Sequence, residues 1–473
     1  MVSCKTFPPQ SPQQVKLSTS SMAATTSKHQ VVIVGGGVTG LVLALCLERL
    51  QVDYVLLEAY SAMAPDAGAS ILVLPNGQRI LDQLGVLDKV AAAGLPQGHI
   101  IYRDGVTAKS LRHSHVADEY RKRHGYNSLW SSRHRIMRAL FEAVADKDRL
   151  LTNKRVTRID DSRPDASVVY TDDGCVYEAQ VVAGCDGVHS TVRKEMWRHA
   201  DLDDPKCVPA VDRDEVACEY ACFFGAGTCS PRVQEGIPEN WGALVSMQDA
   251  QIVLGRGLDN EIYMLCTWAL PQEQRRCAID GVPRFPKEEQ ERAMDKFRDV
   301  VIADDGLRMQ DLFDNLSRSG VTALPHYTLR KWSHGRVICL GDTVHKFNPV
   351  AGQGGNSCID SCALLINALQ DHIAEDLAGQ QEWRRADLGA AFRNVEQASF
   401  DRVSKMVEES QDMIRMLSWR RWRDKFTWRY VIPYVPDSVL LKPHSMAIVG
   451  GARLKGKQFR HPNIEHAWPY DDE

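Results

Sequence analysis

The chain has 473 residues, of which 44% are hydrophobic and 25% are charged. This composition is typical of a globular protein with two or three substructures. Its 57 Lys and Arg residues nearly balance 61 Asp and Glu residues, for a formal net charge of −4, so a nucleic-acid partner is not expected. Thirteen cysteines without a Cys-x-x-Cys pair argue against a disulfide framework or zinc ribbon and fit a reducing compartment.

The first 30 residues contain no acidic residue and no long apolar run, and they are rich in Ser, Thr, Gln and Pro. This composition predicts a disordered extension. A transit peptide is the weaker alternative, because such peptides favour Arg and this segment has only Lys5, Lys16 and Lys28. No run of 18 apolar residues occurs along the chain, so no transmembrane helix is expected.

The next segment reads as strand, glycine turn, helix and strand, at Val31–Val34, about 39–50 and Tyr54–Leu57. A helix is expected at Arg135–Ala145 and paired strands at about 155–183. From about 205 to 330 the pattern becomes β-rich, for example at Cys218–Phe224 and Ala243–Leu254, with one charged helix near 287–300. A helix opens near Gly354, and 387–428 is mostly helical.

The turn after the first strand carries Gly-x-Gly-x-x-Gly, with Gly35, Gly37 and Gly40 at the three positions. These glycines allow a tight turn, close approach of a pyrophosphate, and close packing of helix on strand. Glu58 ends the second strand, where a carboxylate accepts hydrogen bonds from a ribose 2′-OH. The pattern favours FAD or NAD over NADP. The alternative is a glycine-rich turn with a surface glutamate.

Two later motifs favour FAD over NAD. The buried strand Val181–Gly184 runs into Asp186-Gly187, and Ile338–Leu340 runs into Gly341-Asp342. A carboxylate at a strand end, such as Asp342, can bind a hydroxyl of a ribityl chain, which NAD lacks. Amides at the helix start near Gly352–Asn356 can stabilise negative charge on a reduced flavin.

With these three motifs in this order, the sequence resembles the class A flavoprotein monooxygenases, the para-hydroxybenzoate hydroxylase-like group. Within that group, Gly68-Ala69-Ser70-Ile71, the segment Leu74–Gly85 and His345-Lys346 resemble the fungal FAD-dependent monooxygenases of terpenoid and meroterpenoid pathways, the paxilline-type epoxidase family.

The resemblance also implies roles for individual residues. It assigns FAD binding to Glu58, Arg133, Asp342 and Gly355, and an active-site role to Tyr220. Leu72 stands where relatives commonly have Gly, which makes a backbone contact with FAD less certain. Phe347-Asn348 and Val350-Ala351 also depart from the usual residues around Pro349, which could alter the cavity near the flavin.

Several of these residues have structural alternatives. Arg133 at a helix start could contact the FAD diphosphate or be a solvated surface arginine. Arg193 is interpreted as a catalytic residue near the cofactor or substrate entrance, with a helix-surface position as the alternative. A buried Tyr220 could be a core residue with a satisfied hydroxyl. His345 could be a general base or make local hydrogen bonds. We expect no metal site, including at His113 and His115.

The resemblance implies an enzyme that uses NADPH or NADH, which visits the flavin transiently, and O2, through a flavin C4a-hydroperoxide. The predicted activity is epoxidation of a prenyl (farnesyl-type) alkene on a lipophilic meroterpenoid or terpenoid intermediate of fungal secondary metabolism. The first alternative is hydroxylation of a phenolic or polyketide ring. Further alternatives are a non-catalytic FAD-fold carrier of prenylated ligands and a flavin reductase or dehydrogenase.

The predicted fold class is α/β, a discontinuous Rossmann-like FAD-binding domain with an inserted sheet-rich substrate domain and a helical C-terminal tail. The predicted divisions are a disordered extension, the two-part FAD-binding domain, the substrate-binding sheet domain and the C-terminal helical region, at 1–30, 31–200 plus 330–375, 201–329, and 376–473.

The segment 413–433 combines six basic residues with one acid, Asp424. Trp419, Trp422 and Phe426 have helical spacing, so this segment could contact an anionic membrane peripherally. A C-terminal helix that packs its aromatic side chains on the body is the favoured alternative. We therefore expect a cytoplasmic or peripherally membrane-associated protein of undetermined oligomeric state.

Overall fold

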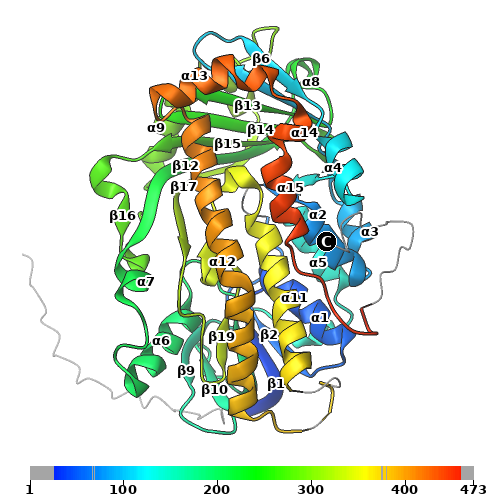
Figure 1. The fold of residues 1–473 in the computed structure, drawn as a ribbon, viewed down its shortest axis with the longest axis vertical. Coiled ribbons are helices and arrows are strands. Elements are labelled where there is room, and N and C mark those ends of the chain that lie inside the picture. Colours follow the sequence, from blue (N-terminus) through cyan, green and yellow to red (C-terminus); the bar gives the residue numbers. More distant parts are fainter. Residues whose placement is uncertain (1–25, 67, 69, 374–376, 380, 460–473) are drawn as a thin grey trace, which may run out of the picture.

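The computed structural model describes residues 26–66, 68, 70–373, 377–379 and 381–459. Residues 1–25 of the predicted extension lie outside the described residues. Figure 1 shows a lower α/β layer and an upper β-sheet, connected along one side by long helices. The amino-terminal strands belong to the lower layer, and a long helix near the carboxyl-terminal end runs from this layer to the upper sheet.

Eight described strands form the lower sheet, in the order β18-β19-β11-β1-β2-β8 with β10 and β9 extending from β11. Its central pairs, β1 with β11 and β1 with β2, are parallel. The first strand begins at Thr26 and not at Val31, because residues 26–29 pair with residues 176–179. The strands are β1 (Thr26–Val34), β2 (Tyr54–Leu57), β8 (Leu150–Leu151), β9 (Val156–Asp160), β10 (Ser167–Thr171), β11 (Val176–Gly184), β18 (Ser333–His334) and β19 (Val337–Cys339).

Helices cover both faces of this sheet. Successive strand residues point to opposite faces, so each strand contributes to two cores. Val31 and Ile33 of β1 pack in a core with α1 (Val38–Arg49), α5 (Arg133–Ala143) and α11 (Gly354–His372). Val32 and Val34 pack on the other side with α6 (Thr191–Asp203). Both faces of the sheet are therefore buried, which explains why Val31–Val34 of β1 and all of β2 are continuously apolar in sequence.

Nine described strands form the upper sheet, in the order β20-β17-β12-β15-β14-β13-β5-β6, with β16 beside β12. The β-rich region predicted from the sequence supplies most of it. Strands β5 and β6 come from the earlier segment that the sequence analysis placed in the FAD-binding part, and β5 pairs in parallel with β13. The strands are β5 (His99–Asp104), β6 (Ser110–Ser114), β12 (Val216–Thr228), β13 (Trp241–Met247), β14 (Ala250–Arg256), β15 (Glu261–Ala269), β16 (Arg276–Cys277), β17 (Leu316–Thr328) and β20 (His345–Lys346).

Smaller elements fill the space beside and between the two sheets. A three-stranded sheet consists of β3 (Ser70–Val73), β7 (Leu129–Ser132) and β4 (Leu95–Pro96). The accompanying helices are α2 (Pro75–Gln83), α3 (Leu87–Ala92), α4 (Val116–His124), α7 (Ala210–Asp214), α8 (Pro231–Gly236), α9 (Lys287–Phe297) and α10 (Met309–Phe313).

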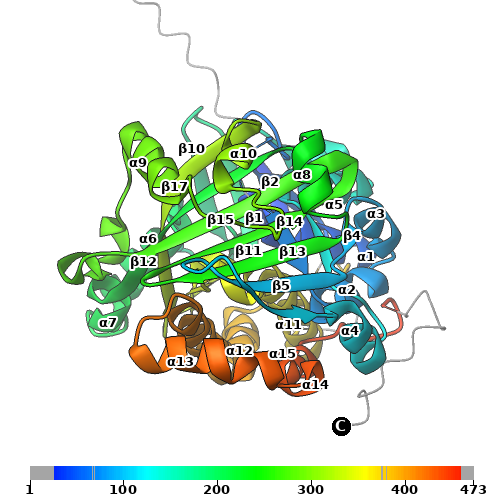
Figure 2. The same ribbon diagram turned by 90° about the horizontal axis from the view of Figure 1, so that it is seen from above.

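The carboxyl-terminal helices join the two layers. Helix α12 (Arg385–Leu417) runs beside α11 and reaches the upper sheet, where α13 (Trp422–Tyr430) and α14 (Asp437–Leu440) follow one edge (Figures 1 and 2). From α14, α15 (Lys442–Val449) runs back down toward α2 (Figure 1). The predicted fold class is thus confirmed. Among the described helices, none is long and apolar enough to span a bilayer.

Replacing Gly40 by Ala should destabilise the fold. A Cβ at Gly40 would lie 1.9 Å from the carbonyl oxygen of Gly35, so α1 would have to move away from the β1 turn. We expect the free energy of unfolding to fall by about 2–4 kcal/mol, measured by chemical denaturation. The matched control is Gly389→Ala within α12, where a Cβ meets only the flexible Arg393 guanidinium at 3.4 Å; an equal loss there would contradict the packing argument.

Candidate active site

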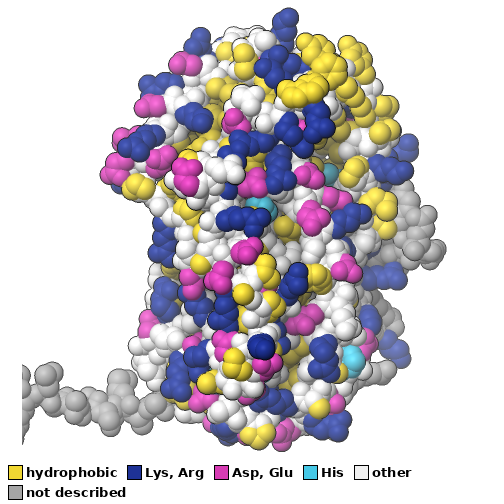
Figure 3. All heavy atoms as spheres, turned by 60° about the vertical axis from the view of Figure 1, so that its left-hand side comes forward, with side chains coloured by type: hydrophobic (Ala, Val, Ile, Leu, Met, Phe, Trp, Pro, Cys, Tyr) yellow, Lys and Arg dark blue, Asp and Glu magenta, His cyan; other side chains and the backbone are white. Residues whose placement is uncertain are grey.

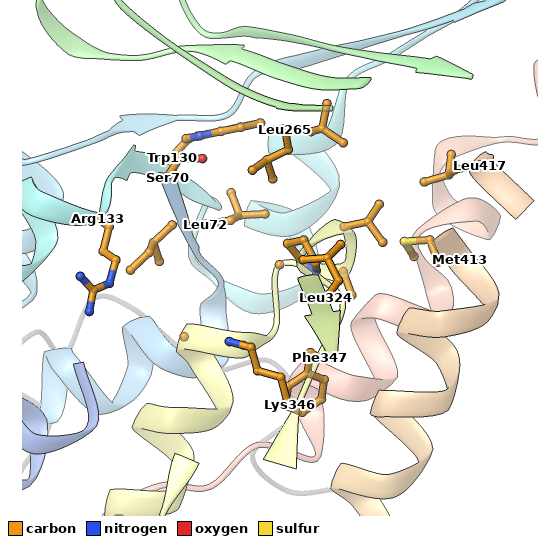
Figure 4. Close-up of a pocket in the computed structure, with 18 of the residues that line it drawn as sticks. Ser70, Leu72, Trp130, Arg133, Leu265, Leu324, Lys346, Phe347, Met413 and Leu417 are labelled. Atoms are coloured by element: carbon orange, nitrogen blue, oxygen red, sulfur yellow. The ribbon is translucent and has the colours of Figure 1, made fainter. Parts of the chain in front are cut away.

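A cavity of about 1060 Å³ lies between the lower sheet, the upper sheet and the carboxyl-terminal helices. Figure 4 shows its length, with Arg133 near one end and Met413 and Leu417 of α12 near the other. The Arg133 end is lined by glycine turns and charged side chains. The α12 end is lined mainly by apolar side chains, so the cavity has two chemically different arms.

The polar arm lies at the carboxyl ends of the parallel strands. Gly35 follows β1 and Cys185 follows β11, while Asp342 comes shortly after β19. The amide of Gly35 donates to the carbonyl of Leu57 on β2 at 2.8 Å. Strand ends in an open α/β sheet form the crevice where nucleotides bind, so all three sequence motifs meet at one place.

The three glycines of the fingerprint occupy different environments. Gly35 has φ +105°, and a Cβ there would lie 2.6 Å from the Cys185 carbonyl oxygen. At Gly40, the Gly35 carbonyl oxygen leaves no space for a Cβ. A Cβ at Gly37 would meet nothing within 4 Å, and Gly37 lines the cavity. Two glycines thus serve close packing, while the third leaves room for a ligand beside the start of α1.

Glu58 and Asp186 bind backbone amides and do not line the cavity. The two carboxylate oxygens of Glu58 accept from the amides of Gly36 at 2.6 Å and Tyr60 at 2.8 Å. Asp186 accepts from the amides of Thr191 and Val192 at the start of α6, and burial raises the pKa of its carboxyl. In this structure, both carboxylates shape the turns that border the polar arm.

Arg133 is the first residue of α5, and its side chain lines the cavity. Its guanidinium forms no salt bridge with a described residue, in contrast to Arg135 and Arg138 of the same helix, which pair with acidic residues. Gly68 has φ +89° and lies against the Arg133 stem, since a Cβ there would be 3.0 Å from the Arg133 Cδ. An unpaired guanidinium facing a cavity is suited to binding an anionic group.

Asp342 lies opposite the start of α11. Its carboxylate is paired with Lys346, and both side chains line the cavity. Gly354 and Gly355 begin α11, which has no side-chain cap and no acidic residue in its first turn. A Cβ at Gly354 would meet nothing within 4 Å. The free amides of a helix start favour negative charge, so α11 presents such a site to the cavity.

Leu72 lines the same wall from β3. Its side chain covers Gly352, where an added Cβ would lie 2.9 Å from the Leu72 Cδ2. Asn356 then holds the strand to α11, since its Nδ2 donates to the Leu72 carbonyl at 2.9 Å and its Oδ1 accepts from the Leu74 amide at 2.9 Å. Leu72 therefore contributes a side chain to the wall while its carbonyl is already bonded.

Arg193 and Tyr220, the two predicted catalytic residues, do not line the cavity. The Arg193 guanidinium is fully buried and donates to the carbonyls of Thr343 at 2.8 Å and Val188 at 2.9 Å. It therefore lies behind the wall, neither at the entrance nor on the helix surface. The buried Tyr220 hydroxyl lies 2.9 Å from the Ser418 Oγ, and burial raises its pKa.

His345 also faces away from the cavity. It is fully buried, with its Nε2 3.1 Å from the Ser361 Oγ of α11, and burial lowers its pKa to about 4. Local hydrogen bonding, one of the two expected alternatives, is what the structure shows. No group of three or more His, Cys, Asp or Glu side chains that could hold a metal ion occurs among the described residues, and their twelve cysteines are free thiols.

The apolar arm has no signature in the sequence. Its lining comes from four distant parts of the chain, namely β5, β13 to β15, β17 and α12 to α15. Prominent members are Tyr102, Leu244, Leu254, Leu265, Leu324, Met413, Leu417 and Trp428. Each of these residues reads as an ordinary core residue, because only the tertiary fold brings them around one space.

The polar arm fits an FAD molecule. Its donors are the starts of α1 and α11 and the free Arg133 guanidinium, and its glycines leave open the surface that a dinucleotide would cover. The apolar arm extends beyond these donors and is lined mainly by apolar side chains, which suits a second, apolar ligand beside the cofactor. Fold and site together define a flavoprotein that holds a further substrate.

Comparison with known proteins also indicates an FAD-binding protein. The FAD binding domain family matches residues 28–200 and 243–384. The FAD-dependent monooxygenase nvfK of Aspergillus novofumigatus is 33% identical over 433 residues, covering 90% of this chain and 88% of that protein. The FAD-dependent monooxygenase olcE of Penicillium canescens is 32% identical over 411 residues, covering 86% and 85%.

The solved structure of Klebsiella pneumoniae HpxO with FAD and uric acid shares the fold, with a TM-score of 0.69 at 19% identity, covering 89% of this chain and 97% of that one. The chain belongs to the family of FAD-dependent monooxygenases. It is an enzyme, and FAD is its cofactor.

Replacing Arg133 by Ala should weaken FAD binding. If the free guanidinium pairs with the diphosphate, its loss removes a charge-assisted hydrogen bond of about 1.5–3 kcal/mol, which corresponds to an increase in Kd of about 10- to 100-fold. Fluorescence titration of the apoprotein with FAD measures this change. Arg138→Ala, on the solvated face of α5 beside Glu142, is the control. Equal affinities for both variants would refute the assignment.

Because His345 is buried, the free energy of unfolding should decrease in acid. Its pKa is about 4 in the folded chain, against 6.5 as the ordinary value, so protons bind the unfolded chain more readily between these pH values. Stability is complete above about pH 6.5 and falls as the pH approaches 4. His345→Gln should reduce the slope of unfolding free energy against pH in this window by up to about 1.4 kcal/mol per unit. An unchanged slope in His345→Gln would contradict this account.

Proposed function

We propose that this FAD-dependent monooxygenase epoxidises an alkene in the prenyl chain of a lipophilic terpenoid or meroterpenoid intermediate of fungal secondary metabolism. The supporting observation is the apolar arm, which extends the cavity from the flavin end toward α12. Along this arm the upper sheet supplies Leu244, Leu254 and Leu265, and α12 supplies Met413 and Leu417. A long hydrocarbon chain would bury its surface there.

The overall reaction balances with a nicotinamide reductant. An alkene, O2, NAD(P)H and a proton give an epoxide, NAD(P)⁺ and water. One oxygen atom adds across the carbon–carbon double bond, and the other leaves as water with two electrons from the nicotinamide. Bound FAD would supply the redox chemistry, and the protein would supply binding and orientation.

The chain's own residues bind, orient and exclude water. The starts of α1 and α11 and the Arg133 guanidinium would hold the cofactor at the polar arm. Arg193 ties Val188 to Thr343 and so fixes two segments of the cavity wall, which gives it a positioning role. The apolar arm keeps water from the reacting alkene, since its lining offers few hydrogen-bond partners.

We also propose that the upper sheet, including β5 and β6, acts as the substrate-binding part, and that the lower layer binds FAD. Tyr220 lies within this upper sheet and bonds to Ser418 after α12. Its proposed active-site role would therefore be exerted by fixing the end of α12 over the apolar arm. Direct contact with substrate would require the Tyr220 hydroxyl to leave Ser418.

Oxygen labelling tests the reaction. Purified enzyme is incubated with prenylated aromatic compounds, NADPH or NADH, and labelled O2, and the products are analysed by mass spectrometry. One labelled atom on the prenyl chain is the expected result. A label on the aromatic ring would instead establish ring hydroxylation, and turnover without O2 would establish a dehydrogenase; either result refutes epoxidation.

Narrowing the apolar arm should impair substrate binding selectively. Leu265→Trp on β15 places a larger side chain in the arm, and we expect KM for a long prenylated substrate to rise about tenfold or more. FAD content, read from the visible flavin absorbance, should be unchanged because the polar arm is intact. A variant that keeps the original KM would show that this arm does not hold the substrate. A variant that loses FAD would show that the two arms are not independent.

A further inference from the structure

Exposed apolar side chains are concentrated at the carboxyl-terminal end of the described chain. Eleven large hydrophobic residues are exposed in the described part, and seven of them lie within residues 422–446. We call these seven the C-terminal apolar patch: Trp422, Phe426, Tyr430, Val431, Tyr434, Val439 and Met446. Figure 3 shows hydrophobic side chains gathered at the upper right of the molecule, with Lys and Arg side chains beside them.

Helix α13 supplies the centre of this patch. Trp422, Phe426 and Tyr430 are spaced four residues apart and therefore share one side of the helix; they are 77%, 52% and 61% exposed. The rings of Phe426 and Tyr430 lie 5.2 Å apart. On the opposite side, Trp428 is buried against Tyr102 of β5. The helix thus has a packed aromatic face and a second, uncovered one.

The sequence predicts that Trp419, Trp422 and Phe426 share one helix face, and this prediction is wrong for Trp419. Trp419 is fully buried, and it lies before α13 with φ +46°. This left-handed residue turns the chain between α12 and α13, so helical spacing cannot be counted through it. Tyr430 takes its place in the exposed stripe.

The basic residues of the segment divide in the same way. Arg415, Arg420 and Arg429 face inward and pair with Glu219, Asp249 and Asp104 of the upper-sheet region. Arg423, and beyond the segment Lys442 of α15, are exposed and form no salt bridge with a described residue. The exposed Arg421, which caps the start of α13, pairs with Asp424 in the first turn of that helix. Positive charge without a partner therefore borders the apolar patch.

The patch also adjoins the apolar arm of the cavity. Val439 of α14 is 57% exposed and at the same time lines the cavity. Trp428, Val435 and Leu440 line it from the inner sides of the same segments. The apolar arm therefore reaches the surface at Val439, within the C-terminal apolar patch. Figure 2 shows α13 and α14 along one edge of the upper sheet.

We propose that the C-terminal apolar patch docks on the surface of an anionic lipid bilayer. Aromatic and aliphatic side chains insert among the headgroups, while Arg423 and Lys442 meet lipid phosphates and carboxylates. A protein partner would also cover apolar side chains, but the unpaired cations around them match a negatively charged surface. Entry of a lipophilic substrate from the bilayer into the apolar arm at Val439 rests on the proposed function; docking itself does not.

Vesicle flotation tests docking without measuring activity. Full-length enzyme carrying FAD should float with vesicles of phosphatidylcholine and phosphatidylserine. Trp422→Ala/Phe426→Ala/Tyr430→Ala should bind these vesicles about tenfold more weakly or worse, because three inserted rings are lost. Leu202→Ala/Val211→Ala, which removes exposed apolar residues of α6 and α7, is the matched control and should float like the wild type.

Two further measurements identify the contact. Arg423→Glu/Lys442→Glu should reduce flotation on phosphatidylserine-containing vesicles, and added salt should reduce wild-type binding. Lipids brominated near the glycerol end should quench wild-type tryptophan fluorescence more than that of Trp422→Phe. Equal quenching of both proteins would contradict insertion at Trp422.

Other results would overturn the proposal. Wild-type enzyme that stays at the bottom of the gradient, or a triple variant that floats normally, excludes docking through this patch. A wild-type dimer that the triple variant converts to a monomer, without vesicle binding, would show that a second copy of the chain covers the patch. Since flavin absorbance reports folding in every variant, failure of docking is separate from failure of the proposed epoxidation.

Discussion

The close approach of α1 to the turn after β1 is the constraint on which the rest of the site depends. Gly40 leaves no room for a side chain beside the Gly35 carbonyl, and Gly35 in turn lies against the Cys185 carbonyl. These two contacts bring the ends of β1 and β11 and the start of α1 to one point. Gly37 can then remain open toward the cavity, so tight packing at two glycines creates the space at the third.

The cavity walls depend on long-range contacts that close around this point. Asn356 bonds α11 to the backbone on both sides of Val73, and Arg193 ties the turn after β11 to the turn after β19. Neither side chain lines the cavity, yet each fixes segments that do. Residues that shape a site can therefore lie outside it, which is why burial and bonding partners separate positioning roles from ligand contacts.

The sequence predicts the lower layer well because its signals are local. A glycine fingerprint, an apolar strand and a following carboxylate lie within a few dozen residues, and the FAD cofactor and the α/β class are confirmed. The roles of individual site residues are still predictions. The placement of β5 beside β13 and the burial of Trp419 could not be predicted, because the first needs pairing across more than a hundred residues and the second depends on one left-handed residue between two helices.

Net charge and residue spacing alone could not decide whether the segment 413–433 packs on the body or contacts a membrane. Its arginines include three that pair with acids of the upper-sheet region and so attach α12 and α13 to the body. Once those are accounted for, the exposed cations without acidic partners are few: Arg423 follows Trp422 on α13, and Lys442 lies between Val439 and Met446 of the patch. Packing on the body and an exposed aromatic surface are therefore not alternatives: the inward ion pairs and Trp428 orient α13, and that orientation is what turns Trp422, Phe426 and Tyr430 outward.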